Sequence, residues 1–193
     1  MSFYEEDTIL NRMKIRDLTL KGPKIVQPRV FYDNRGFFLE PYQQERYKKF
    51  GIKELFIQDN HSFSEYGVLR GMHFQLSPPQ AKLVWVIYGA IFDVIVDIRT
   101  DSSTYGKWEG VILDDKLREQ LFVPSGFAHG FCVLSPHAHV MYKVSASYAP
   151  EVEQTFLFND PAVGIKWPVQ KPIVSNRDQQ APLLQDLTLR SDR

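Results

Sequence analysis

In the first half of the chain lies the run Gly67-Val68-Leu69-Arg70-Gly71-Met72-His73-Phe74-Gln75. Its composition predicts a strand with apolar residues on both faces, yet the run also carries an arginine, a histidine and a glutamine. Such polar groups are costly to bury unless they are hydrogen-bonded or paired with an opposite charge. Either this strand lies at the mouth of a cavity, or the run is not a strand.

The chain beyond residue 50 has the pattern of an all-β protein. Short segments rich in Val, Ile, Phe and Tyr alternate with clusters of Gly, Pro, Asp and Ser, which is typical of strands and turns. No helical pattern long enough for a parallel crossover lies between them, so the spacing predicts a sandwich or barrel. The predicted strands are 54–58, 67–75, 82–99 (two strands that hinge near Gly89), 108–114, 119–123, 129–135, 139–146 and 153–158.

The flanking segments are less regular. An early strand is expected from Lys24 to Phe31, a turn at Asp33-Asn34-Arg35-Gly36 and a second strand at Phe37-Phe38-Leu39. Residues 41–50 predict a short helix, because Pro41 suits its first turn and Gly51 stands just past its end. The segment after Pro168 reads as a loop. We expect a poorly structured leader at 1–13, one domain at 14–184 and a tail at 185–193.

Length and composition describe an ordinary globular domain of 193 residues, long enough to bury a core. Lys plus Arg equals Asp plus Glu, at 23 each, so the net charge of zero argues against nucleic-acid or membrane partners. Cys132 is the only cysteine, which excludes an internal disulfide and favours the cytoplasm. The start MSFYEEDTIL lacks the features of a signal peptide. The longest apolar run, Leu83 to Phe92, ends at Asp93 and is too short to span a membrane.

His73 is the first candidate for chemistry, although a satisfied core histidine is the simpler alternative. In a regular strand its side chain shares a face with Leu69 and Gln75. His129 follows the tight turn Pro124-Ser125-Gly126 at the start of another strand. Two histidines on strands of this pattern resemble the cupin double-stranded β-helix.

Metal chemistry is disfavoured in this cupin-like frame. The first cupin metal motif is usually a His-x-His pair, and here Gln75 stands in place of the second histidine. Two histidines without a further ligand make a poor site for zinc or iron, which take three or more protein ligands. We therefore expect no metal, and keep a metal-dependent cupin enzyme as the alternative.

Tyr142 and three cations complete the candidates. Tyr142 shares a face with Val140 and Val144, so it is either a hydrogen-bonded core tyrosine or a proton donor, since a phenol of pKa ~10 is protonated at neutral pH. The cations near apolar strands are Arg35, Arg70 and Lys82, and an arginine suits a diphosphate. A regular strand puts Arg70 and His73 on opposite faces. Both can reach one cavity only if Gly71 marks a bulge or twist.

Eight motifs occur in the same order as in a known enzyme family. Together they resemble the dTDP-4-dehydrorhamnose 3,5-epimerases, which are nucleotide-sugar epimerases of the cupin superfamily, over residues 14–184. The motifs are Asp33-Asn34-Arg35-Gly36-Phe37-Phe38, Gln58-Asp59-Asn60, Val68-Leu69-Arg70-Gly71-Met72-His73, Ala81-Lys82, Val123-Pro124-Ser125-Gly126-Phe127-Ala128-His129-Gly130-Phe131, Met141-Tyr142-Lys143, Asn159-Asp160-Pro161 and Ile165-Lys166-Trp167-Pro168.

The resemblance implies a mainly β, cupin-like jelly roll and a cofactor-independent epimerase of dTDP-rhamnose biosynthesis, which serves cell-surface polysaccharides. Its substrate would be a dTDP-4-keto-6-deoxyhexose, whose C3 and C5 hydrogens are acidified by the C4 ketone. By resemblance His73 is the base, Tyr142 the acid on the other face, Asp178 the carboxylate that pairs with His73, and Lys82 the group that stabilises the enolate oxygen.

The resemblance also implies a set of substrate-binding residues and a homodimer. The segment with Arg35 and Glu40 would come from the partner subunit. Arg177 stands where the family pattern usually has lysine, so charge is kept but geometry changes. The implied binding residues are Arg35, Glu40, Gln58, Asp59, Asn60, Arg70, Lys82, His129, Glu153 and Arg177.

Three alternatives remain at this point. An epimerase that inverts only C3 or only C5, or that takes a related nucleotide sugar, would use the same base and acid. A metal-dependent cupin would hold stoichiometric metal. A non-catalytic sugar-nucleotide-binding cupin would bind the ligand without exchanging its protons.

Overall fold

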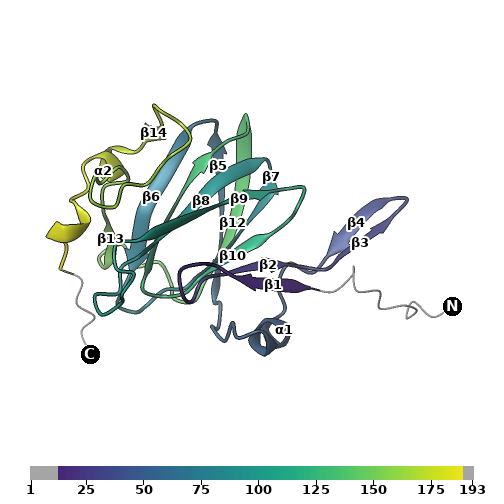
Figure 1. The fold of residues 1–193 in the computed structure, drawn as a ribbon. Coiled ribbons are helices and arrows are strands. Elements are labelled where there is room, and N and C mark those ends of the chain that lie inside the picture. Colours follow the sequence, from purple (N-terminus) through teal and green to yellow (C-terminus); the bar gives the residue numbers. More distant parts are fainter. Residues whose placement is uncertain (1–12, 189–193) are drawn as a thin grey trace.

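The computed structural model describes residues 13–188, and within them most of the strands form two sheets that face each other (Figure 1). All pairings in the two sheets are antiparallel except that of β14 with β6. The first sheet has the order β1 (Lys14–Asp17), β2 (Lys24–Gln27), β10 (Gln120–Val123), β7 (Lys82–Tyr88), β12 (His137–Val144), β5 (Gln58–Glu65). The second has the order β13 (Glu153–Thr155), β6 (Val68–Gln75), β11 (Phe127–Val133), β8 (Ala90–Asp97), β9 (Trp108–Asp114), with β14 (Ile173–Val174) beside β6. This arrangement confirms the predicted mainly β, cupin-like jelly roll.

The main core fills the space between the two sheets. Strand alternation sends Val84 and Val140 of the first sheet and Ile91 and Ile95 of the second into one buried cluster. The outward residues of the first sheet are covered by α1 (Gln44–Lys49), whose Tyr47 is fully buried. The predicted short helix therefore exists, and it buries one outer face of the barrel.

A separate hairpin stands away from the barrel. It consists of β3 (Val30–Asp33) and β4 (Gly36–Leu39), and Figure 1 shows it projecting beyond β1 and β2. The turn predicted at 33–36 is present, since the Asp33 carboxylate accepts a hydrogen bond from the Arg35 backbone N–H at 2.8 Å. The early strand predicted from Lys24 to Phe31 is wrong as a single element, because β2 and β3 belong to different sheets.

Two further predictions are corrected by the structure. The strand expected at 54–58 is instead β5, which begins at Gln58 and ends at Glu65. Its polar Gln58, Asn60 and Ser62 face a cavity, so the sequence lacks the apolar alternation by which a strand is normally recognised. The expected leader and tail lie mostly outside the described residues, at 1–12 and 189–193.

The segment after Pro168 is more regular than a loop. It contains β14, the short helix α2 (Asn176–Gln179) and the 3-10 turn η2 (Leu184–Asp186). Ser175 caps α2 by accepting a hydrogen bond from the Asp178 backbone N–H, as expected for serine before a helix. This segment brings α2 against β6. Within residues 13–188, every helix is too short or too polar to cross a membrane.

β6 is not a regular strand. Its register against β11 pairs His73 with His129 and Arg70 with Phe131, so β6 advances three residues while β11 advances two. The extra residue lies beside Gly71, whose φ of 132° favours glycine. This is the bulge that the sequence required if Arg70 and His73 were to reach one cavity.

Candidate active site

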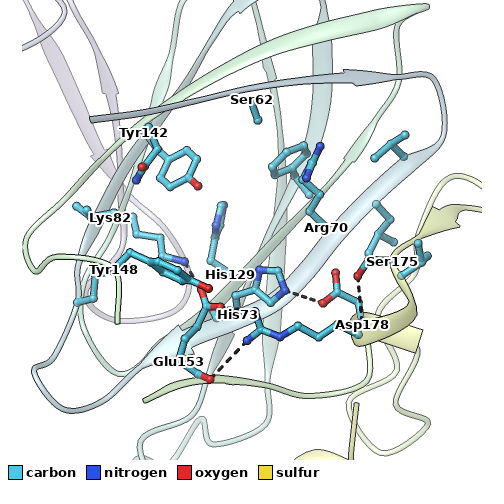
Figure 2. A pocket seen from close by; sticks show the side chains of 18 of the residues that line it. Ser62, Arg70, His73, Lys82, His129, Tyr142, Tyr148, Glu153, Ser175 and Asp178 are labelled. Atoms are coloured by element: carbon cyan, nitrogen blue, oxygen red, sulfur yellow. Dashed lines mark hydrogen bonds and ion pairs between the residues drawn. The ribbon is translucent and has the colours of Figure 1, made fainter. Parts of the chain in front are cut away.

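A cavity of about 630 Å³ opens between the two sheets (Figure 2). One wall comes from β5, β7 and β12, and the other from β6, β11 and β13, closed at the rim by β14 and α2. Its polar lining consists of Gln58, Asn60, Ser62, Arg70, His73, Gln80, Lys82, His129, Tyr142, Tyr148, Glu153, Ser175, Arg177 and Asp178.

His73 forms a hydrogen-bonded pair with Asp178. The His73 Nε2 atom lies 2.7 Å from the Asp178 Oδ1 atom, and the aspartate side chain is only 4% exposed. The other carboxylate oxygen accepts a hydrogen bond from the Gly71 backbone N–H at 3.3 Å. Burial by itself would raise the pKa of Asp178, but the hydrogen bond and charge of His73, with the Gly71 N–H, outweigh burial and lower it. Asp178 is therefore an ionised partner that fixes the orientation of the imidazole.

Tyr142 enters the same cavity from the opposite sheet. It lies on β12 and packs against the core, while its hydroxyl points into the cavity in Figure 2. Burial, and next the charge of Glu153, raise the pKa of Tyr142 above its ordinary value, although Arg70 opposes them. The phenol is therefore protonated at neutral pH and faces the His73 side of the cavity.

Lys82 is a buried cation that lines the same cavity. Its side chain is on β7, and its Nζ atom lies 3.5 Å from the backbone oxygen of His73. Burial lowers the pKa of Lys82 to about 8, although the charges of Glu153 and Asp93 oppose this change. At neutral pH the cavity thus holds a poorly solvated positive charge that can stabilise an oxyanion.

Arg70 shares the cavity with His73, as the bulge in β6 allows. Its guanidinium donates from Nε to Ser64 Oγ at 3.0 Å and from Nη2 to the Phe63 backbone oxygen at 3.4 Å. Both partners are on β5, so the first sheet orients the arginine that the second sheet carries. Among residues 13–188 the guanidinium has no further hydrogen-bond partner, so its remaining donors can bind an anionic ligand.

His129 is held by Asp93, a residue that the sequence analysis did not select. The His129 Nε2 atom lies 2.5 Å from Asp93 Oδ1, and Asp93 is fully buried on β8. The sequence signal was present, because Asp93 interrupts the apolar run of residues 83–92. It could not be interpreted without knowing that β8 and β11 pair in a register that places Asp93 beside His129.

Other selected residues lie elsewhere. Asp59 is on the outer face of β5 and forms an ion pair with Lys143 at 2.7 Å, so its position does not support the expected contact with substrate. Arg35 is on the projecting hairpin and binds Asp33, while Glu40 binds Arg46, all remote from this chain's own cavity. Gln58 and Asn60 do line the cavity and are joined by a hydrogen bond of 2.8 Å.

Gln75, which stands where a metal-binding cupin has a histidine, has a structural role. It is 3% exposed and donates to the backbone oxygen of Pro78 at 3.0 Å. Its side-chain oxygen accepts from the Ala149 backbone N–H at 3.3 Å, so Gln75 ties the loop with Tyr148 to β6. Within residues 13–188, no group of three or more His, Cys, Asp or Glu side chains is arranged to hold a metal ion.

Comparisons with known proteins agree with this geometry. The family model of dTDP-4-dehydrorhamnose 3,5-epimerase matches residues 17–186. The chain is 48% identical over 167 residues to the enzyme of that name from Neisseria gonorrhoeae, covering 86% of this chain but only 51% of that relative. It is 49% identical over 156 residues to the one from Shigella flexneri, covering 80% of this chain and 86% of the relative.

A solved structure shows the same likeness. The dTDP-6-deoxy-D-glucose-3,5-epimerase of Legionella pneumophila, crystallised with dTDP-4-keto-L-rhamnose, matches with a TM-score of 0.89 and 44% identity. The match covers 91% of this chain and 95% of that one.

Proposed function

The chain belongs to the dTDP-4-dehydrorhamnose 3,5-epimerase family, and from this premise we propose how its cavity inverts the C3 and C5 centres of a dTDP-4-keto-6-deoxy sugar. The reaction is an isomerisation. The C4 ketone acidifies the hydrogens on both neighbouring carbons, and removal of either one leaves an enolate. Return of a proton to the opposite face inverts the centre.

The observation that carries this function is the placement of His73 and Tyr142 on opposite sheets. In a glucose-configured chair the C3 and C5 hydrogens are both axial and lie on the same face of the ring. One base below the ring and one acid above it therefore serve both centres. Asp178 orients the imidazole of His73, which takes the proton, and the protonated Tyr142 supplies the new hydrogen. His73 then gives its proton to solvent and Tyr142 takes one from solvent, so that both groups are ready for the second centre.

Lys82 and Arg70 supply the electrostatic part of the reaction. The enolate places negative charge on O4, and the buried ammonium of Lys82 stabilises that charge more strongly than water does, because the cavity has a low dielectric. Arg70, whose guanidinium is oriented by Ser64, binds the diphosphate together with His129. Gln58 and Asn60 contribute polar contacts on the same wall.

The site is completed by a second subunit in this proposal. Arg35 and Glu40 are remote from their own cavity, on or beside a hairpin that projects from the barrel. Tyr32 and Phe38 on the same hairpin are 68% and 65% exposed, which is unusual for large apolar side chains. A homodimer that exchanges hairpins would cover these side chains and bring Arg35 and Glu40 to the partner's substrate.

Solvent exchange tests the roles of the base and the acid. In D2O, the wild-type protein with dTDP-4-keto-6-deoxyglucose should incorporate deuterium at C3 and C5 with inversion, as read by NMR. His73→Asn should slow exchange by about 10²- to 10⁴-fold, the usual contribution of a general base. Tyr142→Phe should retain exchange on the His73 face and lose inversion. Exchange near the wild-type rate in His73→Asn would sink the assignment of the base.

The same spectra separate the alternative of a single inverted centre. Deuterium at C3 alone, or at C5 alone, would identify an epimerase of one centre. Binding of the nucleotide sugar with no deuterium at either carbon would identify a non-catalytic binding protein.

A further inference from the structure

The helix that carries Asp178 is too short to hold itself in place. α2 has four residues, and an isolated helix of that length is unstable because nucleation costs more than its few hydrogen bonds return. The position of Asp178, and with it the orientation of His73, must therefore come from contacts between this segment and the barrel.

Two adjacent residues of α2 bind two neighbouring strands. Asp178 reaches the Gly71 N–H and the His73 ring on β6. Arg177 donates from Nη1 to Glu153 Oε2 at 2.6 Å and from Nη2 to the Glu153 backbone oxygen at 3.5 Å. Glu153 is on β13, which pairs with β6 so that Thr155 lies opposite His73.

We propose that Arg177 is a positioning residue: by binding Glu153 it fastens α2 to β13 and so holds Asp178 against His73. This inference rests on the proposed function, because it assigns a role in the same reaction. Figure 2 draws both interactions as dashed lines, one between His73 and Asp178 and one that ends at Glu153.

The charges and geometry support this role. Burial would lower the pKa of Arg177, but the hydrogen bond and charge of Glu153 raise it, so the guanidinium stays charged. Its charge is already balanced by a carboxylate whose side chain is only 16% exposed. The planar fork of arginine binds a side-chain and a backbone oxygen of Glu153 at once, whereas lysine would offer a point charge.

A double-mutant cycle tests the proposal. Arg177→Gln, Glu153→Gln and the double variant are compared with the wild type for kcat and KM on dTDP-4-keto-6-deoxyglucose. Each single change should lower kcat by about tenfold or more, because a small misplacement of a catalytic group is costly, while KM changes by less than about twofold. The double variant should be no worse than the worse single variant, because the two residues act as one contact. Arg177→Lys should give an intermediate kcat.

A second readout does not depend on turnover. The Nε2–H proton of His73, shared with Asp178, should give a downfield NMR resonance in the wild type that weakens or shifts in Arg177→Gln and Glu153→Gln. A resonance unchanged in both variants would overturn the proposal, even if the protein proved inactive on this substrate. Inactivity of the wild type would count against the proposed function alone.

Two kinetic results would also overturn the proposal. A rise in KM of about tenfold with unchanged kcat in Arg177→Gln would mean that the guanidinium binds substrate directly. Effects that add fully in the double variant would mean that Arg177 and Glu153 act independently.

Discussion

Three side chains in the cavity differ in protonation because they differ in surroundings. Asp178 is kept ionised by His73 and the Gly71 N–H, Tyr142 is kept protonated by burial, and Lys82 has lost much of its basicity through burial. Groups whose pKa values are pushed apart are typical of acid–base sites. In the proposed reaction at neutral pH, these shifts would leave one carboxylate to orient the base, one phenol to donate a proton and one cation to stabilise the enolate.

The pKa of Lys82 predicts an alkaline limit to the reaction. Burial holds that pKa at about 8, and only the protonated amine stabilises the enolate. Because deprotonation of one group removes the activity, kcat/KM should fall above pH 8 by about tenfold per pH unit. A pH profile of kcat/KM measures this. Lys82→Arg should move the limit upward, and a wild-type profile that stays flat to pH 10 would contradict the role given to Lys82.

The bulge in β6 is the element on which the site depends. It brings Arg70 and His73 to one cavity, which alternation in a regular strand would prevent. A Cβ added at Gly71 would lie 2.6 Å from the Gly130 Cα and 3.0 Å from the His129 backbone oxygen. β6 and β11 therefore approach each other too closely at this point for any side chain.

Comparison of Gly71→Ala with Gly36→Ala separates the cost of the close approach between β6 and β11 from the cost of backbone strain. The φ angles are 132° and 134°, but a Cβ at Gly36 would have nothing within 4 Å. Backbone strain alone should cost Gly36→Ala about 1 to 2 kcal/mol of unfolding free energy, and overpacking should add about 1 to 3 kcal/mol in Gly71→Ala. Urea denaturation measures both. Equal losses would show that the contact with β11 is unimportant.

At the scale of the whole molecule, the projecting hairpin is the feature that a single chain leaves unexplained. It places four large aromatic side chains in solvent and keeps Arg35 remote from the cavity. If the hairpin completes a partner's site, two inactive variants should complement each other, because each site draws residues from two chains.

Complementation of His73→Asn with Arg35→Ala tests the shared site. A mixed dimer contains one cavity with an intact His73 and an intact partner hairpin, so random assortment should restore about a quarter of the wild-type activity. The proteins are co-expressed or refolded together and assayed by NMR. His73→Asn mixed with Tyr142→Phe is the control: every cavity then contains a defective residue, and activity should not return. Failure of the first pair to complement would count against the exchanged hairpin.

Much of the fold could be predicted from local pattern. The pair of strands that hinges at Gly89 is confirmed as β7 and β8, and the strand predicted at 108–114 matches β9 residue for residue. In both cases β-branched and aromatic residues lie between clear turn residues. The sequence did not predict β5 or α2, and the reason is the same for both. Their inward residues are polar because they face a cavity, and a segment without apolar inward residues resembles a loop.

The sequence by itself determined the class of fold, the apolar faces of most strands and, through eight ordered motifs, the family and its candidate base, acid and carboxylate. Those properties depend on residue type and on spacing along the chain. Only the tertiary structure decided which side chains meet. The contact between Arg177 and Glu153 depends on where helix α2 lies against the barrel. The bulge at Gly71, the pairing of His129 with Asp93 and the separation of Asp59 all depend on register between strands distant in sequence. A shift of one residue would turn each side chain to the other face of its sheet.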